Sequence, residues 1–156
     1  MLAHKFDDNR VDWSQPVYIQ PKLDGVRCII RAEFSDVFKN LEVKAYSRTG
    51  KEFKNIQHIL DELIPFFAKS PDVILDGELY NHDLKHDFEK IISLVRKQKP
   101  TENDRLDAKN LTQFHCYDYI SAPVYDSYKT RMHQLVNSDI YSYCVKYVPA
   151  MLVDSY

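Results

Sequence analysis

The chain has 156 residues, 44% of them hydrophobic and 28% charged, so it is long enough for about one domain with a buried core. Its 21 basic and 23 acidic side chains give a net charge of −2, which excludes a uniformly basic nucleic-acid coat but not a local basic patch. No apolar run approaches the roughly 18 residues of a membrane span, and residues 1–10 lack the apolar stretch of a signal peptide. Three cysteines without a CxxC pair argue against a disulfide framework or a zinc finger. We therefore expect reduced thiols, a cytoplasmic location and no membrane partner.

The first part of the chain has the two-residue periodicity of β-strands. Residues 26–34 alternate between apolar and charged side chains, as a half-buried strand does, and residues 16–20 and 41–46 are further predicted strands. Turns are expected at residues 21–25 and 47–51. Such short connections favour antiparallel pairing.

Helical periodicity replaces the alternation further along the chain. One apolar helical face is formed by Ile56, Ile59, Leu60, Leu63 and Phe67. Asn55 is expected to cap this helix and Pro65 to end or kink it. A second stripe from Leu84 to Val95 predicts another helix, and residues 126–136 predict a third, short one.

The remaining segments complete a mixed pattern. Residues 72–80 are predicted as a buried strand carrying a turn glycine, residues 111–120 as an aromatic-rich strand, and residues 143–152 as a last apolar stretch. The polar residues 98–110 are expected to form an exposed loop. This order predicts an α+β domain with mostly antiparallel sheets and packed helices.

A lysine, an aspartate and an arginine crowd the turn Lys22-Leu23-Asp24-Gly25-Val26-Arg27. A lysine becomes a nucleophile when burial or nearby positive charge helps it to lose its proton. An arginine fork binds two phosphate oxygens. Taken alone, the segment is also typical of a charged β-turn.

Three further clusters carry polar or aromatic groups. Asp76-Gly77-Glu78 places two carboxylates on one face of a strand, where they could hold Mg²⁺ or accept a hydrogen bond from a hydroxyl; a hairpin turn is the alternative. Residues 47–51 offer hydroxyls and cations to a phosphate or sugar without the P-loop spacing, and a solvated turn is again the alternative. The aromatic side chains of residues 114–119 suit base stacking or core packing.

In their order and spacing the four clusters resemble the ATP-dependent DNA ligases, and more broadly the covalent nucleotidyltransferases that include RNA ligases and mRNA capping enzymes. The matching elements are Lys22-x-Asp24-Gly25-x-Arg27, Ser47-Arg48-x-Gly50, Asp76-Gly77-Glu78 and Tyr117-Asp118-Tyr119. The likeness covers residues 16–150, and the small viral and phage ligases are most similar. It implies an ATP-grasp-like nucleotidyltransferase (adenylation) domain.

The resemblance also implies roles for single residues. Lys22 would attack the α-phosphate of ATP to form lysyl-AMP; the AMP would pass to the 5′-phosphate of nicked double-stranded DNA, and the 3′-hydroxyl would seal the strand. Nucleotide contacts are implied for Gln20, Pro21, Lys22, Leu23, Arg27, Arg48, Glu78 and Tyr117. Within this set, the backbone at Gln20 and Pro21 would lie beside the adenine edge. Arg27 and Arg48 would contact the ribose or nick phosphates, Glu78 would meet a ribose hydroxyl, and Tyr117 would stack on adenine. Glu78, with Asp76 as a weaker candidate, would help to place Mg²⁺.

The chain departs from the family pattern in three respects. Gln20 stands where many members carry glutamate, and Tyr117 where phenylalanine is commoner. The later glutamate and lysine motifs and the OB-fold domain do not follow before Tyr156. We therefore expect residues 1–156 to be a partial adenylation domain, weak or inactive without its missing C-terminal part. Only 21 residues precede Lys22, which favours ATP over NAD.

Several alternatives stay open from the sequence. Within the superfamily they are an RNA ligase and a GTP-using mRNA capping guanylyltransferase. Outside catalysis, the chain could be a remnant that binds only nucleotide or nucleic acid. His82 and His86, at the i, i+4 spacing of a helix, are a candidate metal module, with solvated surface histidines as the alternative.

Overall fold

The computed structural model describes residues 5–121 and 126–154. In chain order its elements are the short 3-10 helix η1 (Asp8–Arg10), β1 (Val17–Ile19), β2 (Val26–Ser35), β3 (Asn40–Tyr46), α1 (Gln57–Lys69), β4 (Ile74–Tyr80), the 3-10 helix η2 (His82–Leu84), α2 (Phe88–Val95), α3 (Glu102–Leu111), β5 (Gln113–Ile120), α4 (Tyr128–Val136), β6 (Val145–Tyr147) and β7 (Met151–Val153).

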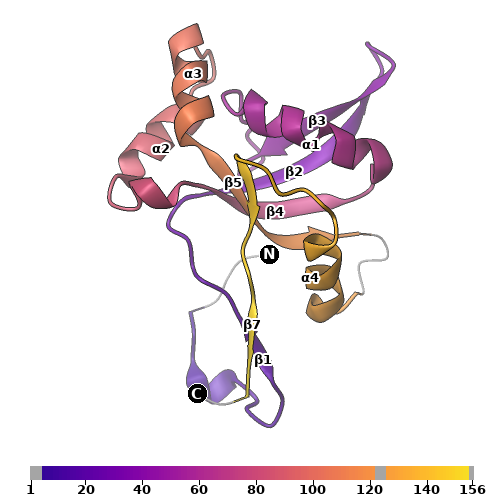
Figure 1. Ribbon diagram of the computed structural model, residues 1–156, viewed down its shortest axis with the longest axis vertical. Helices are drawn as coiled ribbons and strands as arrows, with labels where there is room; N and C mark the ends of the chain where they lie inside the picture. The colour runs from indigo at the N-terminus through magenta and orange to yellow at the C-terminus, as the bar shows by residue number, and fades with distance from the viewer. Residues whose placement is uncertain (1–4, 122–125, 155–156) are drawn as a thin grey trace.

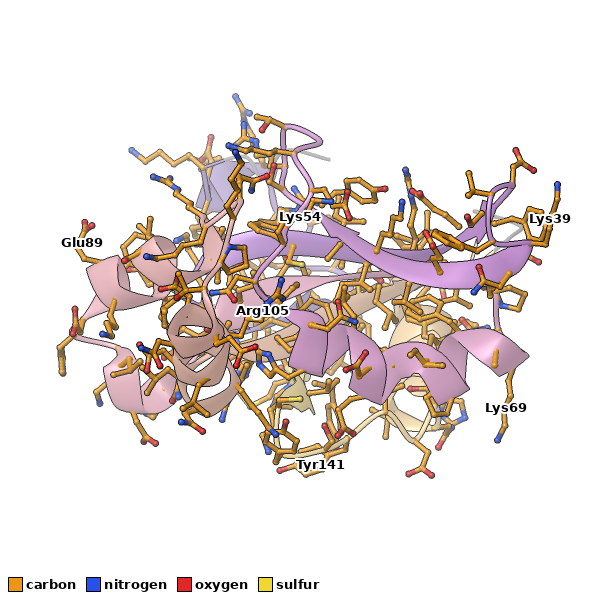
Figure 2. The ribbon with its side chains drawn as sticks, turned by 90° about the horizontal axis from the view of Figure 1, so that it is seen from above. Lys39, Lys54, Lys69, Glu89, Arg105 and Tyr141 are labelled. Carbon is orange, nitrogen blue, oxygen red and sulfur yellow. The ribbon has the colours of Figure 1, made fainter. Side chains whose placement is uncertain are left out.

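A five-stranded sheet in the order β3-β2-β4-β5-β6 forms the body of the molecule. Neighbouring strands from β3 to β5 are antiparallel, and β6 joins β5 in parallel. Helix α1 lies along one face of this sheet, with α2 and α3 beside it (Figure 2). The expectation of an α+β domain is confirmed.

The hydrophobic core lies between this sheet and α1. Alternate residues of the strands, among them Ile30, Ala45, Leu75 and Phe114, are fully buried on this face. The apolar stripe of α1 packs against them through Ile59, Leu63 and Phe67. Each such side chain contributes roughly 1.5–3 kcal/mol by leaving water. Because side chains alternate across a strand, burial of one face leaves the opposite face available for polar groups.

Strands β1 and β7 form a separate two-stranded ribbon, with Val17 opposite Val153 and Ile19 opposite Met151. The ribbon projects away from the main sheet (Figure 1). The expected strand at residues 16–20 therefore exists, but it pairs with the end of the chain rather than with β2. Residues 20–25 are consequently a crossing between two sheets and not a hairpin turn.

The prediction of a loop at residues 98–110 was wrong, because α3 begins at Glu102. Thr101 and Asp104 form a reciprocal capping box, in which each side chain accepts from the backbone N–H of the other. Ala108 is the only residue of this helix that is buried, so the segment has no apolar stripe to reveal it. The Thr-x-x-Asp spacing was the signal that could have found it.

The first predicted helix differs from expectation at both ends. Asn55 does not cap α1: its buried side chain donates to the carbonyls of Leu94, at 3.0 Å, and Asp104, at 3.1 Å. Pro65 lies within α1, which continues to Lys69 because Phe67, beyond the proline, packs in the core.

Two other boundaries also differ from the predictions. The apolar stripe from Leu84 to Val95 is divided, since η2 ends at Leu84 and α2 begins only at Phe88. Gly77 is not a turn, because β4 continues on both sides of it and the ring of Phe114 leaves no room for a side chain there.

In residues 5–121 and 126–154, no helix combines the length and the apolarity required to cross a bilayer. Cys28, Cys116 and Cys144 are all free and buried.

Candidate active site

The face of the main sheet opposite α1 carries the charged and aromatic residues singled out in the sequence. Arg27 of β2 is the register partner of Glu78 on β4, and Asp76 lies two residues before Glu78 on the same face. Tyr117 and Asp118 of β5 join them. These five residues, Arg27, Asp76, Glu78, Tyr117 and Asp118, are called the polar face below.

A β-bulge explains how two consecutive residues of β5 reach this face. Gly77 pairs with Cys116, but Asp76 pairs with Asp118, so Tyr117 is passed over in the register. A bulge sets two residues of one strand against one of its partner and redirects their side chains. Tyr117 and Asp118 are therefore both brought beside Asp76, which strict alternation would not allow.

Arg27 and Asp76 form a bidentate ion pair on the polar face. Arg27 Nη2 lies 2.7 Å from Asp76 Oδ2, and Nε lies 3.1 Å from Oδ1. The side chains are 24% and 11% exposed, so the pair is shielded from water. This hydrogen bonding raises the pKa of Arg27 above its usual value, and the guanidinium keeps its charge and its orientation.

Glu78 lies at the junction of the polar face and the lysine-bearing segment. The pKa of Glu78 is raised to about 7, mainly by burial and to a smaller degree by the negative charge of Asp76. A hydrogen bond from the Gly25 backbone N–H and the nearby charge of Lys22 act in the opposite direction on the same pKa. Lys22, an exposed residue, therefore lies within electrostatic reach of Glu78.

Gly25 brings the lysine-bearing segment close to β4. A β-carbon at this position would overlap the backbone carbonyl oxygen of Leu79 and come within 2.8 Å of Glu78 Cγ. The absence of a side chain thus permits the hydrogen bond between the Gly25 N–H and Glu78.

The residues just before the lysine connect the ribbon to the sheet. Pro21, just before the lysine, is exposed, and Leu23, just after it, is half-buried. The side chain of Gln20 donates to the backbone carbonyls of Val148, at 3.0 Å, and Tyr117, at 3.3 Å.

Arg48 is the one predicted nucleotide contact outside this group of neighbours. It is exposed in the turn after β3, which is closed by hydrogen bonds between Ser47 and Lys51 in both directions. Tyr46 pairs with Ile29, so the turn begins at the same end of β2 as Arg27. The structure shows no contact between Arg48 and the polar face.

Tyr117 and Asp118 differ in their surroundings: the Tyr117 hydroxyl is near negative charge, whereas the Asp118 carboxylate has a cationic partner. Burial raises the pKa of the Tyr117 hydroxyl, and the nearby charges of Asp76 and Glu78 add to the effect, so the ring stays neutral. Asp118 is bound by Arg131 of α4, with Nε to Oδ1 at 2.8 Å and Nη2 to Oδ2 at 3.2 Å. This second bidentate pair ties α4 to β5.

The sequence did not reveal every group at the site. His115 of β5 is the register partner of Glu78. Burial and the charge of Lys146 lower the pKa of His115 to about 4, so it is neutral at physiological pH. Arg131 was also missed. No local spacing links either residue to its partner, although His115 lies within the predicted aromatic-rich strand at residues 111–120.

The carboxylates fit Mg²⁺ unequally. Both oxygens of Asp76 already accept from Arg27, whereas Glu78 accepts one backbone hydrogen bond and keeps further acceptor capacity. Among residues 5–121 and 126–154, no group of three His, Cys, Asp or Glu side chains could enclose a metal ion. Of the two carboxylates, Glu78 is therefore the one with acceptor capacity left for a cation.

The candidate metal module at His82 and His86 does not form. Helix η2 ends at Leu84, so the two residues do not share a helical face. The ring nitrogen Nδ1 of His82 instead forms a hydrogen bond with the Tyr80 hydroxyl, 3.0 Å away.

Similar proteins were found in sequence and in structure. The DNA ligases of Enterobacteria phages T4 and T6 are each 30% identical to the chain over 90 residues. The aligned part is 53% of this chain but 18% of either phage protein, so the chain spans only a small part of their length.

Solved structures share the fold at lower identity. One described as "Pmar-Lig_Pre." has a TM-score of 0.63 and 21% identity, covering 89% of this chain and 31% of its own. Another, described as "DNA binding with a minimal scaffold: Structure-function analysis of Lig E DNA ligases", has a TM-score of 0.64 and 20% identity, covering 99% of this chain and 51% of its own.

A family model, the ATP dependent DNA ligase domain, matches residues 1–138 and thus most of the chain. The polar face, with the lysine-bearing segment beside it, lies within the matched residues. The chain belongs to the ATP-dependent DNA ligase domain family.

Proposed function

We propose that this chain carries out the nucleotidyl-transfer chemistry of an ATP-dependent DNA ligase, with Lys22 as the nucleophile. The observation that carries the proposal is convergence: Lys22, Arg27, Glu78 and Tyr117 come from three separate segments and meet at one face of the sheet.

In the first step, Lys22 Nζ forms a bond to the α-phosphorus of ATP as the bond to the bridging oxygen breaks. Pyrophosphate leaves with that electron pair, and the amine gives up a proton to solvent, which the exposure of Lys22 allows. Catalysis of this kind rests on positioning and on neutralisation of phosphate charge.

The neighbouring residues are placed to hold the nucleotide. Glu78 can accept a hydrogen bond from a ribose hydroxyl, and the neutral ring of Tyr117 offers a face for adenine. The guanidinium of Arg27 brings positive charge to the same face, oriented by Asp76. Arg48, Gln20, Pro21 and Leu23 remain predicted contacts at the margin of this site.

Mg²⁺ would reach the site with the phosphates of ATP, and Glu78 is the residue best placed to hold it. It would supply positive charge against the charge that develops on the leaving pyrophosphate.

The later steps concern the nick. AMP would pass from Lys22 to the 5′-phosphate of nicked double-stranded DNA, and attack by the 3′-hydroxyl would release AMP and seal the strand. The matches to phage DNA ligases support DNA as the substrate. That the chain is a partial adenylation domain, weak without further parts of a ligase, stays a prediction.

Radiolabelled nucleotides test this function. The purified chain is incubated with Mg²⁺ and either ATP or GTP labelled at the α-phosphate, and the protein is then chased with nicked DNA or nicked RNA. We expect label from ATP on the wild type, none on Lys22→Ala, and transfer to nicked DNA. Label from GTP would instead indicate a capping enzyme, and transfer to RNA alone an RNA ligase. Nucleotide binding without any label would indicate a non-catalytic remnant.

A further inference from the structure

The side chain of Gln20 lies where three segments distant in sequence converge. Its Nε2 donates to Val148 O at 3.0 Å and to Tyr117 O at 3.3 Å, and lies 3.9 Å from the sulfur of Met132. These partners belong to the connection between β6 and β7, to the bulge of β5 and to α4. The sequence separations range from 97 to 128 residues, so the contacts exist only in the folded chain.

The two carbonyls meet where the parallel pairing of β5 and β6 ends. The last register pair is Cys116 with Tyr147, and one more backbone hydrogen bond follows from Val148 N to Cys116 O, at 2.7 Å. Beyond it Tyr117 is bulged out of the register with β4. The Gln20 amide binds both strands at this point and supplies the donors that the ladder no longer provides.

The two carbonyl partners of Gln20 can only accept hydrogen bonds. An amide NH₂ carries two hydrogens and serves both carbonyls, whereas a carboxylate has only lone pairs to present. The site therefore requires a donor, and this requirement also fixes the orientation of the amide. A carboxylate here would leave two partly buried carbonyls facing a negative charge.

Lys22 lies two residues beyond this anchor. On its other side, Gly25 is held by its hydrogen bond to Glu78 and by close packing on Leu79. Residues 21–24 have no regular secondary structure of their own, so the anchors at residues 20 and 25 determine where they run.

We propose that Gln20 is a positioning residue for the nucleophile. It fixes the path of residues 20–25, and so the place from which Lys22 approaches the α-phosphate, by donating to the carbonyls of Tyr117 and Val148. The inference rests on the proposed function, because its readout is formation of lysyl-AMP. Cys116 and Asp118, which flank Tyr117, are paired with β4 independently of Gln20, so the stacking ring is expected to stay in place when the amide is lost.

The test is single-turnover labelling of the whole chain with ATP and Mg²⁺, in the wild type, Gln20→Met and Gln20→Glu. Methionine keeps the approximate length without donors, and glutamate keeps the shape as an acceptor. The labelled amplitude reports the folded, competent fraction, whereas the rate constant at saturating ATP reports alignment. A merely structural role would lower the amplitude and leave the rate constant unchanged.

We expect both variants to lower the rate constant by about 10- to 100-fold, the cost of a small misplacement of a reacting group. The ATP concentration for half-maximal rate should change far less, because the adenine contact predicted at residue 20 is with the backbone and the stacking ring of Tyr117 is kept. Gln15→Glu is the matched control, since Gln15 is exposed and acquires the same charge change away from the site; it should behave as wild type.

Two results would overturn the inference while leaving the proposed function intact. One is a rate constant within about twofold of wild type in both Gln20 variants, and the other is an equal loss in the Gln15 control. If the wild type itself takes no label, the proposed function fails and the inference falls with it.

Discussion

Asp76 binds Arg27 through both of its carboxylate oxygens, at 2.7 Å and 3.1 Å. The aspartate of the Asp-Gly-Glu element is thus tied to the arginine of the Lys-x-Asp-Gly-x-Arg element, 49 residues away. The two motifs recognised separately in the sequence are joined in the structure by this pair.

Asp76→Asn removes the carboxylate charge from a shielded ion pair. We expect a loss of about 1–3 kcal/mol in the free energy of unfolding, measured in urea, because hydrogen bonds to charged groups are stronger than neutral ones. Labelling by ATP should slow about tenfold as Arg27 loses its orientation. Asp72→Asn, at an exposed position before β4, is the control. Equal behaviour of the two variants would show that the pair does not orient Arg27.

Glu78→Gln tests the raised pKa of the polar face. The pKa of Glu78 in the folded chain, about 7, lies above the ordinary value of 4.5, so the folded state holds an extra proton between these pH values. The resulting stabilisation is complete below about pH 4.5 and is lost as the pH rises through about 7. Stability of the wild type should therefore fall relative to Glu78→Gln between about pH 4.5 and pH 7. The expected difference is about 1–2 kcal/mol, less than the full linkage value because water partly screens the side chain.

The control for Glu78→Gln is the same substitution at a glutamate that is exposed to solvent. Glu89 lies exposed on α2 and points away from the body of the molecule (Figure 2), so Glu89→Gln should give a pH profile parallel to wild type. A Glu78→Gln profile that also stays parallel would contradict the assigned pKa.

Gly25→Ala tests the close approach of the lysine-bearing segment to β4. The new β-carbon would overlap Leu79 O, a backbone atom that cannot rotate away. We expect a loss of about 1–3 kcal/mol in stability and slower labelling by ATP, because the segment must move off Glu78. In Gly50→Ala, with φ at +85° and no atom within 4 Å, the cost should be backbone strain alone, about 1 kcal/mol. Unchanged stability in Gly25→Ala would show that the segment is not held against β4.

Tyr117 is predicted to stack on adenine. Tyr117→Phe should bind ATP almost as well as wild type, since the aromatic face is kept. Tyr117→Ala should weaken binding by about 1–3 kcal/mol, or roughly 5- to 150-fold in Kd, measured by calorimetry. Tyr141→Ala, at an exposed tyrosine on the other side of the molecule (Figure 2), is the control. Equal affinity in all three variants would exclude stacking by Tyr117.

The strands and the fold class could be predicted because burial of one face imposes a two-residue period. Residues 26–34 alternate cleanly, and β2 occupies almost the same range. Helix α3 was missed for the opposite reason: it is solvated on nearly all sides, so its sequence has no periodicity, and only the capping box at Thr101 signalled its start.

The residues that gather at the candidate site could be predicted from the sequence, but the hydrogen bonds and ion pairs that join them could not. Sequence order brought Lys22, Glu78 and Tyr117 into one hypothesis because the motif spacing resembled a known family. The pairing of Asp118 with Arg131 and the donors of Gln20 depend on the bulge at Tyr117 and on the crossing between the two sheets. Neither the bulge nor the crossing can be recognised from neighbouring residues in the sequence, since each arises only when distant strands come together.

The most direct measurement is the intact mass of the chain after incubation with ATP and Mg²⁺, followed by peptide mapping. The account predicts one AMP adduct, located on Lys22, absent from Lys22→Ala and present in Lys69→Ala, whose substitution lies at the end of α1. An adduct on another residue, or an adduct that persists in Lys22→Ala, would contradict the assignment of Lys22 as the nucleophile of this chain.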